Sequence, residues 1–335
     1  MISDKLMNAN TFALKRLIPS KETMALAGIL ISMVLFFQIV TSTFIDKANF
    51  VDILKEASKL CVISFGMAII IAAGGIDLSL GHIAGFSAII ATTILKEYNV
   101  GIVVGLVCGI SVGIIFGLFN GLLVSYLGIS SFIVTLGTQF IILGLRYWIT
   151  SGNIIMFLPD PYTIIGNGKI FSIHNTILIM IIVAIICYYQ MERTVFGRRV
   201  SSTGGNITAS WLSCINVRKY TMLTFVMGGI FASVTGIVHT SHMGVVSVDI
   251  GDGFLLDALI IAVFSVVVYG RMKTLGVILV TIILISLTNG LTMMGVNPFF
   301  VKFVKGLLLL GALSINMAMQ SEYFINRMYK RKAQI

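Results

Sequence analysis

The residues best suited to chemistry gather in one short polar run, Gly74 to Gly81, which interrupts an otherwise apolar stretch. Asp77 and Ser79 stand in this run, among glycines that permit an irregular backbone. An ionisable residue at membrane depth is a functional candidate, because a charge in hydrocarbon is costly. Asp and Ser also cap the N-termini of helices. We therefore expect either a functional site or a simple helix cap here, within a helix pair or one broken, partly re-entrant element.

Other catalytic or metal-binding patterns are absent from the sequence. It contains no G-x-x-x-x-G-K-[ST] loop for nucleotide phosphates and no H-E-x-x-H pair. His239 and His242 share one helical face, but a metal site needs more than two ligands. Asp249 and Asp252 follow in a predicted outer loop, where we expect them to be solvated or to form a docking surface. We predict no enzymatic activity, no cofactor and no metal.

The polar stretch 191–218 is the second informative region. Asn206 is a plausible N-cap for a short helix. An apolar ridge would follow it, formed by Ala209, Trp211, Leu212 and Ile215. Such a helix either lies on the membrane surface or fits as a knob into a groove of a soluble partner.

The composition defines the scaffold that must position these residues. Of 335 residues, 57% are hydrophobic and only 11% are charged, whereas a soluble domain has about 25% charged residues. Long apolar runs without the alternation of a β-barrel indicate membrane-spanning helices. We predict an all-α polytopic integral membrane protein with a transmembrane domain over 24–318, between tails 1–23 and 319–335. Its ten helical segments are 24–44, 58–73, 82–95, 101–127, 129–150, 175–190, 219–240, 254–270, 275–292 and 299–318.

The distribution of basic residues predicts the orientation. Lys and Arg concentrate in the N-terminal tail, the 191–218 loop, the 270–274 link and the C-terminal tail. The positive-inside rule then places both termini in the cytoplasm, with an even number of spans. The net charge of +10 therefore reflects membrane orientation, and we expect no nucleic-acid partner. The four cysteines have no spacing typical of a metal site or disulfide framework.

Glycines recur at every fourth position in the fourth predicted span. They form a smooth stripe that lets another helix approach the backbone closely, either within the subunit or at a subunit interface or pore. The stripe consists of Gly101, Gly105, Gly109, Gly113, Gly117 and Gly121.

Four blocks, taken together, resemble the permease subunits of bacterial ABC importers for monosaccharides such as ribose, xylose, arabinose and galactose. The resemblance extends over about residues 25–318. The blocks are Gly75 to Gly81, Phe132 to Thr138, Thr194 to Arg198 with Gly204 to Asn206 and Ile215 to Val217, and Gly295 to Phe299 leading to Val304 to Gly306.

The resemblance implies a cell inner membrane, multi-pass permease that works with other subunits. Two permease subunits would enclose the pathway, a cytoplasmic ATPase would drive it, and an extracytoplasmic sugar-binding protein would deliver the cargo. Membrane lipid completes the expected partners. The segment Gly204 to Val217 would couple to the ATPase through Gly204, Gly205, Asn206, Ala209, Trp211, Leu212 and Ile215. The pathway or broken-helix motif would comprise Gly75, Asp77, Ser79, Gly81, Thr135, Gly137 and Thr138.

The sequence departs from the family pattern at several positions. Ser130-Ser131 replaces a usual proline, Ile207-Thr208 stands where acids are frequent, and Cys214 stands where glycine is frequent. The segment Phe264 to Tyr269 replaces a longer stretch rich in glycine and serine, which hints at a subunit that pairs with a different permease instead of its own copy.

Two alternatives remain open at the level of sequence. Within the ABC class, the cargo could be a nucleoside or a signalling furanone. In another class, a secondary transporter would use broken helices with sites near the bilayer midplane. The scarcity of charged residues deep in the predicted spans disfavours that second class.

Overall fold

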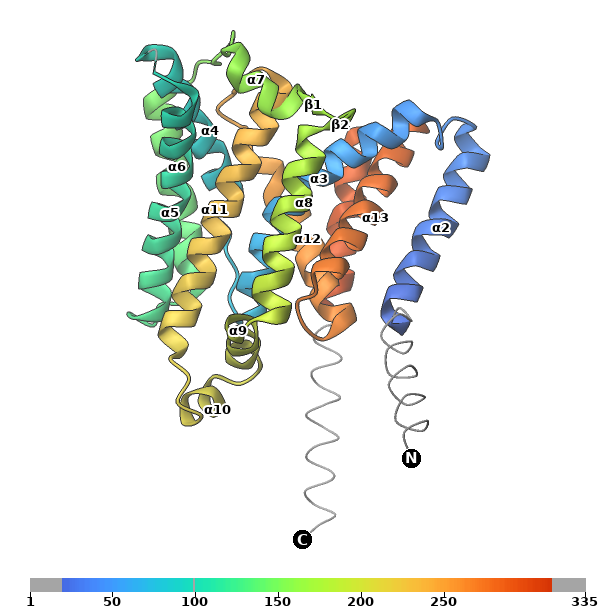
Figure 1. Cartoon of the computed structure of the whole chain (residues 1–335). Helices are drawn as coiled ribbons and strands as arrows, with labels where there is room; N and C mark the ends of the chain where they lie inside the picture. The colour runs from blue at the N-terminus through green and yellow to red at the C-terminus, as the bar shows by residue number, and fades with distance from the viewer. Residues whose placement is uncertain (1–19, 99, 315–335) are drawn as a thin grey trace, which may run out of the picture.

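The computed structural model describes residues 20–98 and 100–314, which fold almost entirely into helices (Figure 1). These residues contain one sheet, a hairpin of two short antiparallel strands, β1 (Lys169–Ile170) and β2 (Ile173–His174). Residues 298–314 are also helical. The helices in chain order are α2 (Lys21–Thr41), α3 (Lys47–Ala72), α4 (Leu80–Glu97), α5 (Ile102–Ser125), α6 (Ser131–Thr150), α7 (Asp160–Asn167), α8 (Asn175–Tyr188), the π-helical turn η1 (Tyr189–Arg193), α9 (Val195–Gly205), α10 (Ile207–Leu212), α11 (Val217–Met243), α12 (Asp252–Tyr269) and α13 (Thr274–Met293).

Seven helices of the described chain are long and apolar enough to cross a membrane. They are α2, α5, α6, α8 with η1, α11, α12 and α13. This confirms the predicted all-α polytopic membrane protein. The number of ten spans, the domain limits and the orientation stay predictions. Residues 1–19 and 315–335, which include most of both predicted tails, lie outside the described part.

Helix α3 begins at Lys47, eleven residues before the predicted start at 58, so that boundary was wrong. Charged residues early in α3 break the apolar run but not the helix. Lys55 Nζ lies 2.8 Å from Asp52 Oδ1, and Lys59 Nζ lies 2.6 Å from Glu56 Oε1. These pairs at i and i+3 stabilise a helix, and they carry α3 out to the end of the molecule where α7 lies (Figure 1).

The core forms around α3 and α11. Every residue of α3 from Ala57 to Ile70 is buried. Helix α5 packs against α4 and α11 through its glycine stripe, since a Cβ at Gly113 would overlap the carbonyl oxygen of Gly229. Gly105, Gly109, Gly117 and Gly121 are likewise buried against these two helices. Gly101 lies apart from the stripe, because it precedes α5 and has no neighbour within 4 Å of its Cβ position.

The link between α3 and α4 runs into the bundle without helical structure. It begins beside Gly204, at the end of the molecule that carries α9 and α10. It ends where α4 starts, with the Leu80 side chain against Gly228 of α11. Gly228 lies eleven residues along α11 from Val217, which corresponds to about 16 Å of helix. The predicted element is therefore two helices, α3 and α4, joined by an irregular segment that covers part of the membrane depth.

Candidate functional site

The side chain of Asp77 anchors a polar cluster inside the bundle. Asp77, Ser79 and Asn120 are fully buried, and Thr138 is 1% exposed. Asp77 Oδ1 accepts from the Ser79 backbone N–H at 2.8 Å and from Ser79 Oγ at 2.6 Å. Asn120 Nδ2 of α5 donates to Asp77 Oδ2 at 3.3 Å and to Ser79 Oγ at 2.9 Å. Thr138 Oγ1 of α6 donates to Asn120 Oδ1 at 2.6 Å, which closes a four-residue network across three elements.

Hydroxyl groups of α6 bind the irregular backbone of the 73–79 segment. The N–H of Ile76 donates to Ser131 Oγ at 3.2 Å, and the N–H of Leu78 donates to Thr135 Oγ1 at 3.0 Å. An unpaired backbone N–H within a bilayer costs several kcal/mol, so these bonds permit the broken helix. Ser131, which in the sequence is only a departure from the family pattern, thus accepts a hydrogen bond from the backbone of the 73–79 segment.

The remaining residues of the predicted pathway motif lie in different surroundings. Gly75 is half-buried beside Ile70 and Phe225. Gly81 faces Gly251 so closely that a Cβ would overlap backbone atoms. Gly137 is exposed with nothing near its Cβ position, so it does not join the cluster. The buried positions of α6 include Val134, Thr135 and Thr138, which share one face of the helix, and Gly137 lies outside that face.

Sequence reasoning missed a buried arginine. Arg146 of α6 is fully buried, and it connects α4 to the start of α12. Its Nη1 lies 2.8 Å from Asp252 Oδ1 and 2.8 Å from His82 Nδ1, and its Nη2 donates to the Ile250 carbonyl at 2.9 Å. Asp252, expected to be solvated, is 43% exposed and ion-paired. The sequence contained a signal for this residue, because Arg146 falls inside the predicted span 129–150 and a charged residue within a span indicates a functional or structural role.

A second ion pair fixes the last described helix. Lys305 Nζ lies 2.7 Å from Asp257 Oδ1, and both side chains are largely buried. Asp257 therefore lies buried on the second turn of α12. Among the described residues, no group of three or more His, Cys, Asp or Glu residues could hold a metal.

The 191–218 region contains two helices, α9 and α10, connected at Asn206. The Asn206 side chain accepts from the Ala209 backbone N–H at 2.8 Å, so it caps α10 as predicted. Gly204 and Gly205 are both exposed, but the backbone of Gly204 approaches the carbonyl of Ala72, whereas Gly205 has no neighbour within 4 Å of its Cβ position. Trp211 and Leu212 are each 70% exposed, at the tip of the molecule (Figure 1).

A groove separates α10 from the end of α5. It has a volume of about 1030 Å³ and is lined by residues from both sides, including Tyr126, Trp211 and Ile215. Arg218 lies over the Tyr126 ring at 6.0 Å from its centroid. Cys214 closes the turn after α10 with a φ of 59°, a left-handed conformation that favours glycine.

Comparisons with known proteins place the chain in a family. Residues 49–313 match the family described as "Branched-chain amino acid transport system / permease component". The ribose import permease protein of Bacillus subtilis (strain 168) is 31% identical over 288 residues, covering 85% of this chain and 89% of that protein. The galactose/methyl galactoside import permease protein of Haemophilus influenzae is 29% identical, covering 82% and 88%.

The ribose import permease protein of Escherichia coli (strain K12) is 27% identical over 296 residues, covering 86% of this chain and 92% of that protein. No solved structure matches the chain. The family match covers more than half of the sequence, and the first of these relatives exceeds 30% identity over most of both chains. The chain therefore belongs to the family of transport-system permease components, and it is a multi-pass membrane protein.

Proposed function

We propose that the chain is the membrane-spanning subunit of an ATP-driven importer for a monosaccharide. Membership of the permease family and relatives named for ribose and galactose import support this cargo class. The sequence has no phosphate-binding loop, so ATP hydrolysis belongs to a separate cytoplasmic subunit. A sugar-binding protein would deliver cargo at the opposite end, where α7 and the hairpin lie.

The exposed apolar tip of α10 carries the proposal of coupling. Trp211 and Leu212 are each 70% exposed, and Ile207 of the same helix is 61% exposed; contiguous exposed apolar side chains mark interaction sites. The Asn206 cap and the bond from the Ile215 N–H to the Ser210 carbonyl fix both ends of this short helix. A rigid apolar knob of this kind fits a groove in a soluble partner.

We assign the cluster at Asp77 a positioning role. Its polar atoms bind one another, and the α6 hydroxyls bind the backbone of the link. Cargo hydroxyls would compete with bonds that are already formed. The half-buried residues Gly75, Ile76 and Leu78 would instead line the pathway, together with a second permease subunit of the same or a different kind.

Uptake measurements in cells test the proposed function. The protein should be expressed with its cognate ATPase and binding protein, and uptake of labelled ribose, galactose, a nucleoside and leucine should be compared. We expect sugar uptake that stops when ATP is depleted and survives a protonophore when ATP is maintained. Uptake that collapses with the protonophore while ATP stays high would indicate a secondary transporter. Uptake of leucine or the nucleoside alone would replace the sugar assignment.

A further inference from the structure

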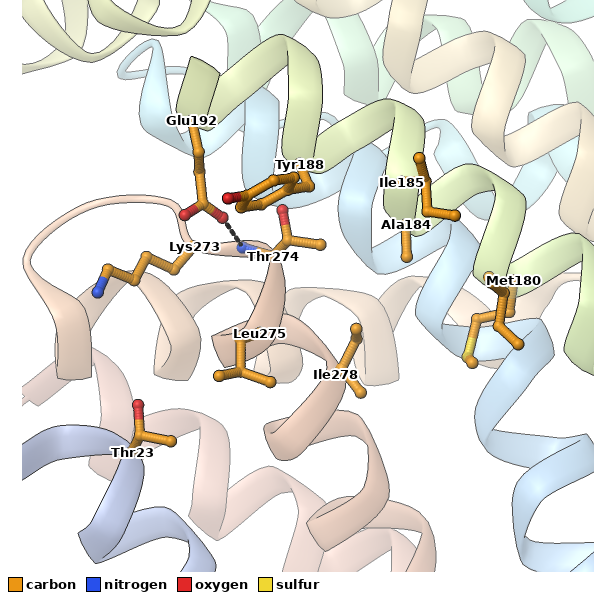
Figure 2. A pocket seen from close by; sticks show the side chains of 11 residues that line it. Thr23, Met180, Ala184, Ile185, Tyr188, Glu192, Lys273, Thr274, Leu275 and Ile278 are labelled. Carbon is orange, nitrogen blue, oxygen red and sulfur yellow. Dashed lines mark hydrogen bonds between the residues drawn. The ribbon is translucent and has the colours of Figure 1, made fainter. Parts of the chain in front are cut away.

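A crevice opens between α2, α8 and α13, near the end of the molecule that carries α9 (Figure 2). Its volume is about 440 Å³. Helix α2 packs chiefly on α13, and only Leu26 and Phe37 of α2 are buried. The crevice therefore lies where the first described helix stands apart from the rest of the bundle.

The walls of the crevice are apolar along the helices. Met180, Ala184 and Ile185 of α8 face Leu275 and Ile278 of α13 across the opening (Figure 2). Ile185 is 62% exposed and Leu275 is 49% exposed. The span from Met180 to Tyr188 corresponds to about 12 Å of helix, which suits the upper part of one acyl chain.

The mouth of the crevice is polar and carries a basic residue. Lys273 Nζ lies 5.0 Å from the centroid of the Tyr269 ring, and Thr23 Oγ1 lies 2.8 Å from the Tyr269 hydroxyl. In the described part of the chain, Lys273 forms no salt bridge. A cation and a hydroxyl at the membrane boundary, above an apolar wall, match the two chemistries of an anionic lipid.

One carboxylate in the crevice, Glu192, needs an explanation because it would repel an anion. Its Oε1 accepts from the Thr274 backbone N–H at 2.9 Å, at the first turn of α13 (Figure 2). That N–H belongs to the positive end of the helix dipole. The charge of Glu192 is thereby offset locally. A second carboxylate, Glu22 on the first turn of α2, lies within electrostatic range of Lys273 but forms no salt bridge with it among the described residues.

We propose that this crevice binds one anionic phospholipid. Its phosphate would contact Lys273 and the Thr23 hydroxyl, and one acyl chain would lie between α8 and α13. The lipid would bridge α2 to the bundle at the boundary predicted to be cytoplasmic, where basic crevices between helices attract anionic headgroups. This inference is independent of the proposed cargo and of the coupling role of α10.

Lipid binding to the purified, delipidated full chain tests the proposal. Native mass spectrometry should compare phosphatidylglycerol with phosphatidylcholine of identical acyl chains. We expect one preferred phosphatidylglycerol adduct. Lys273→Ala should weaken it about fivefold, the effect of one basic residue near a charged headgroup. The matched control is Lys302→Ala, because Lys302 also lies beside an aromatic ring, that of Phe299, but near the other end of the molecule; this variant should leave the adduct unchanged.

A second measurement locates the lipid without a substitution. A photoreactive phosphatidylglycerol with its reactive group in the acyl chain should label peptides of α8 and α13. Equal binding of both lipids, equal effects of the two lysine variants, or labelling confined to other helices would overturn the proposal. Crosslinks from the crevice to a second permease chain, with no labelled lipid, would also overturn it.

Discussion

The short helix α10 and the irregular 73–79 segment both interrupt the series of long helices, yet their side chains lie in opposite environments. Trp211 and Leu212 of α10 are each 70% exposed, whereas Asp77 and Ser79 are fully buried. The polar group is inside and the apolar group is outside, the reverse of the usual distribution in water. The inner segment is held by hydrogen bonds within the chain, whereas the side chains at the tip of α10 are exposed and, on our proposal, are covered by a partner.

This contrast predicts that substitutions in the two regions have different effects. Changes in the inner region should lower the free energy of unfolding, because they leave buried polar atoms unpaired. Changes at the tip of α10 should leave that free energy unchanged and remove an interaction with another protein.

Removal of Arg146 should be the most destabilising change. Arg146→Met leaves Asp252, His82 and the Ile250 carbonyl without their shared donor. Each buried acceptor left unpaired costs about 1–3 kcal/mol, and we expect a loss of about 3 kcal/mol, measured by unfolding in mixed micelles. Adding Asp252→Leu to Arg146→Met should recover part of the loss. A single variant as stable as the parent would contradict the role of Arg146 as a clamp.

The network around Asp77 should be the next most sensitive. Asn120→Leu removes the bonds to Asp77, Ser79 and Thr138, and we expect a loss of about 2 kcal/mol from unsatisfied buried groups. Ser111→Ala is the matched control on the same helix, because Ser111 bonds only the Val107 carbonyl in its own helix. The control should unfold like the parent. Equal stabilities for all three proteins would show that the network does not hold the broken helix.

The turn after α10 should give the smallest change. Cys214 has a φ of 59°, and a side chain in this conformation costs about 1 kcal/mol. Cys214→Gly should slow protease cleavage between α10 and α11 slightly, by relieving this strain. The matched control is Cys214→Ala, which keeps the Cβ atom and should therefore be cleaved at the same rate as the parent. Faster cleavage of the glycine variant would contradict the strain.

The sequence predicted the positions of the long helices, because apolar runs are local signals. It also predicted the Asn206 cap, since capping depends on three neighbouring residues. The start of α3 was wrong because ion pairs inside one helix extended it beyond its apolar run. Gly137 was placed in the motif by its position in the sequence, but the rotation of α6 turns it outward.

The partners of the buried polar residues could not be predicted in the same way. The bonds from Asn120 to Asp77 and from Arg146 to Asp252 join positions 43 and 106 residues apart. Their pairing depends on how α4, α5, α6 and α12 pack, which no local pattern specifies. The depth to which the 73–79 segment enters the bundle likewise depends on how α11 packs beside it, since Leu80 at the end of the segment contacts Gly228 of α11.

The central claim is that the exposed tip of α10 binds a separate ATPase subunit. Retention of the ATPase by the purified permease tests this claim most directly. The variant Trp211→Glu with Leu212→Glu should be compared with Phe171→Glu with Ile173→Glu, an exposed apolar pair on the hairpin at the other end. Both variants should reach the membrane and unfold like the parent. We predict that the α10 variant loses the ATPase on co-purification and that the hairpin variant retains it. Full retention of the ATPase by the α10 variant would contradict the account.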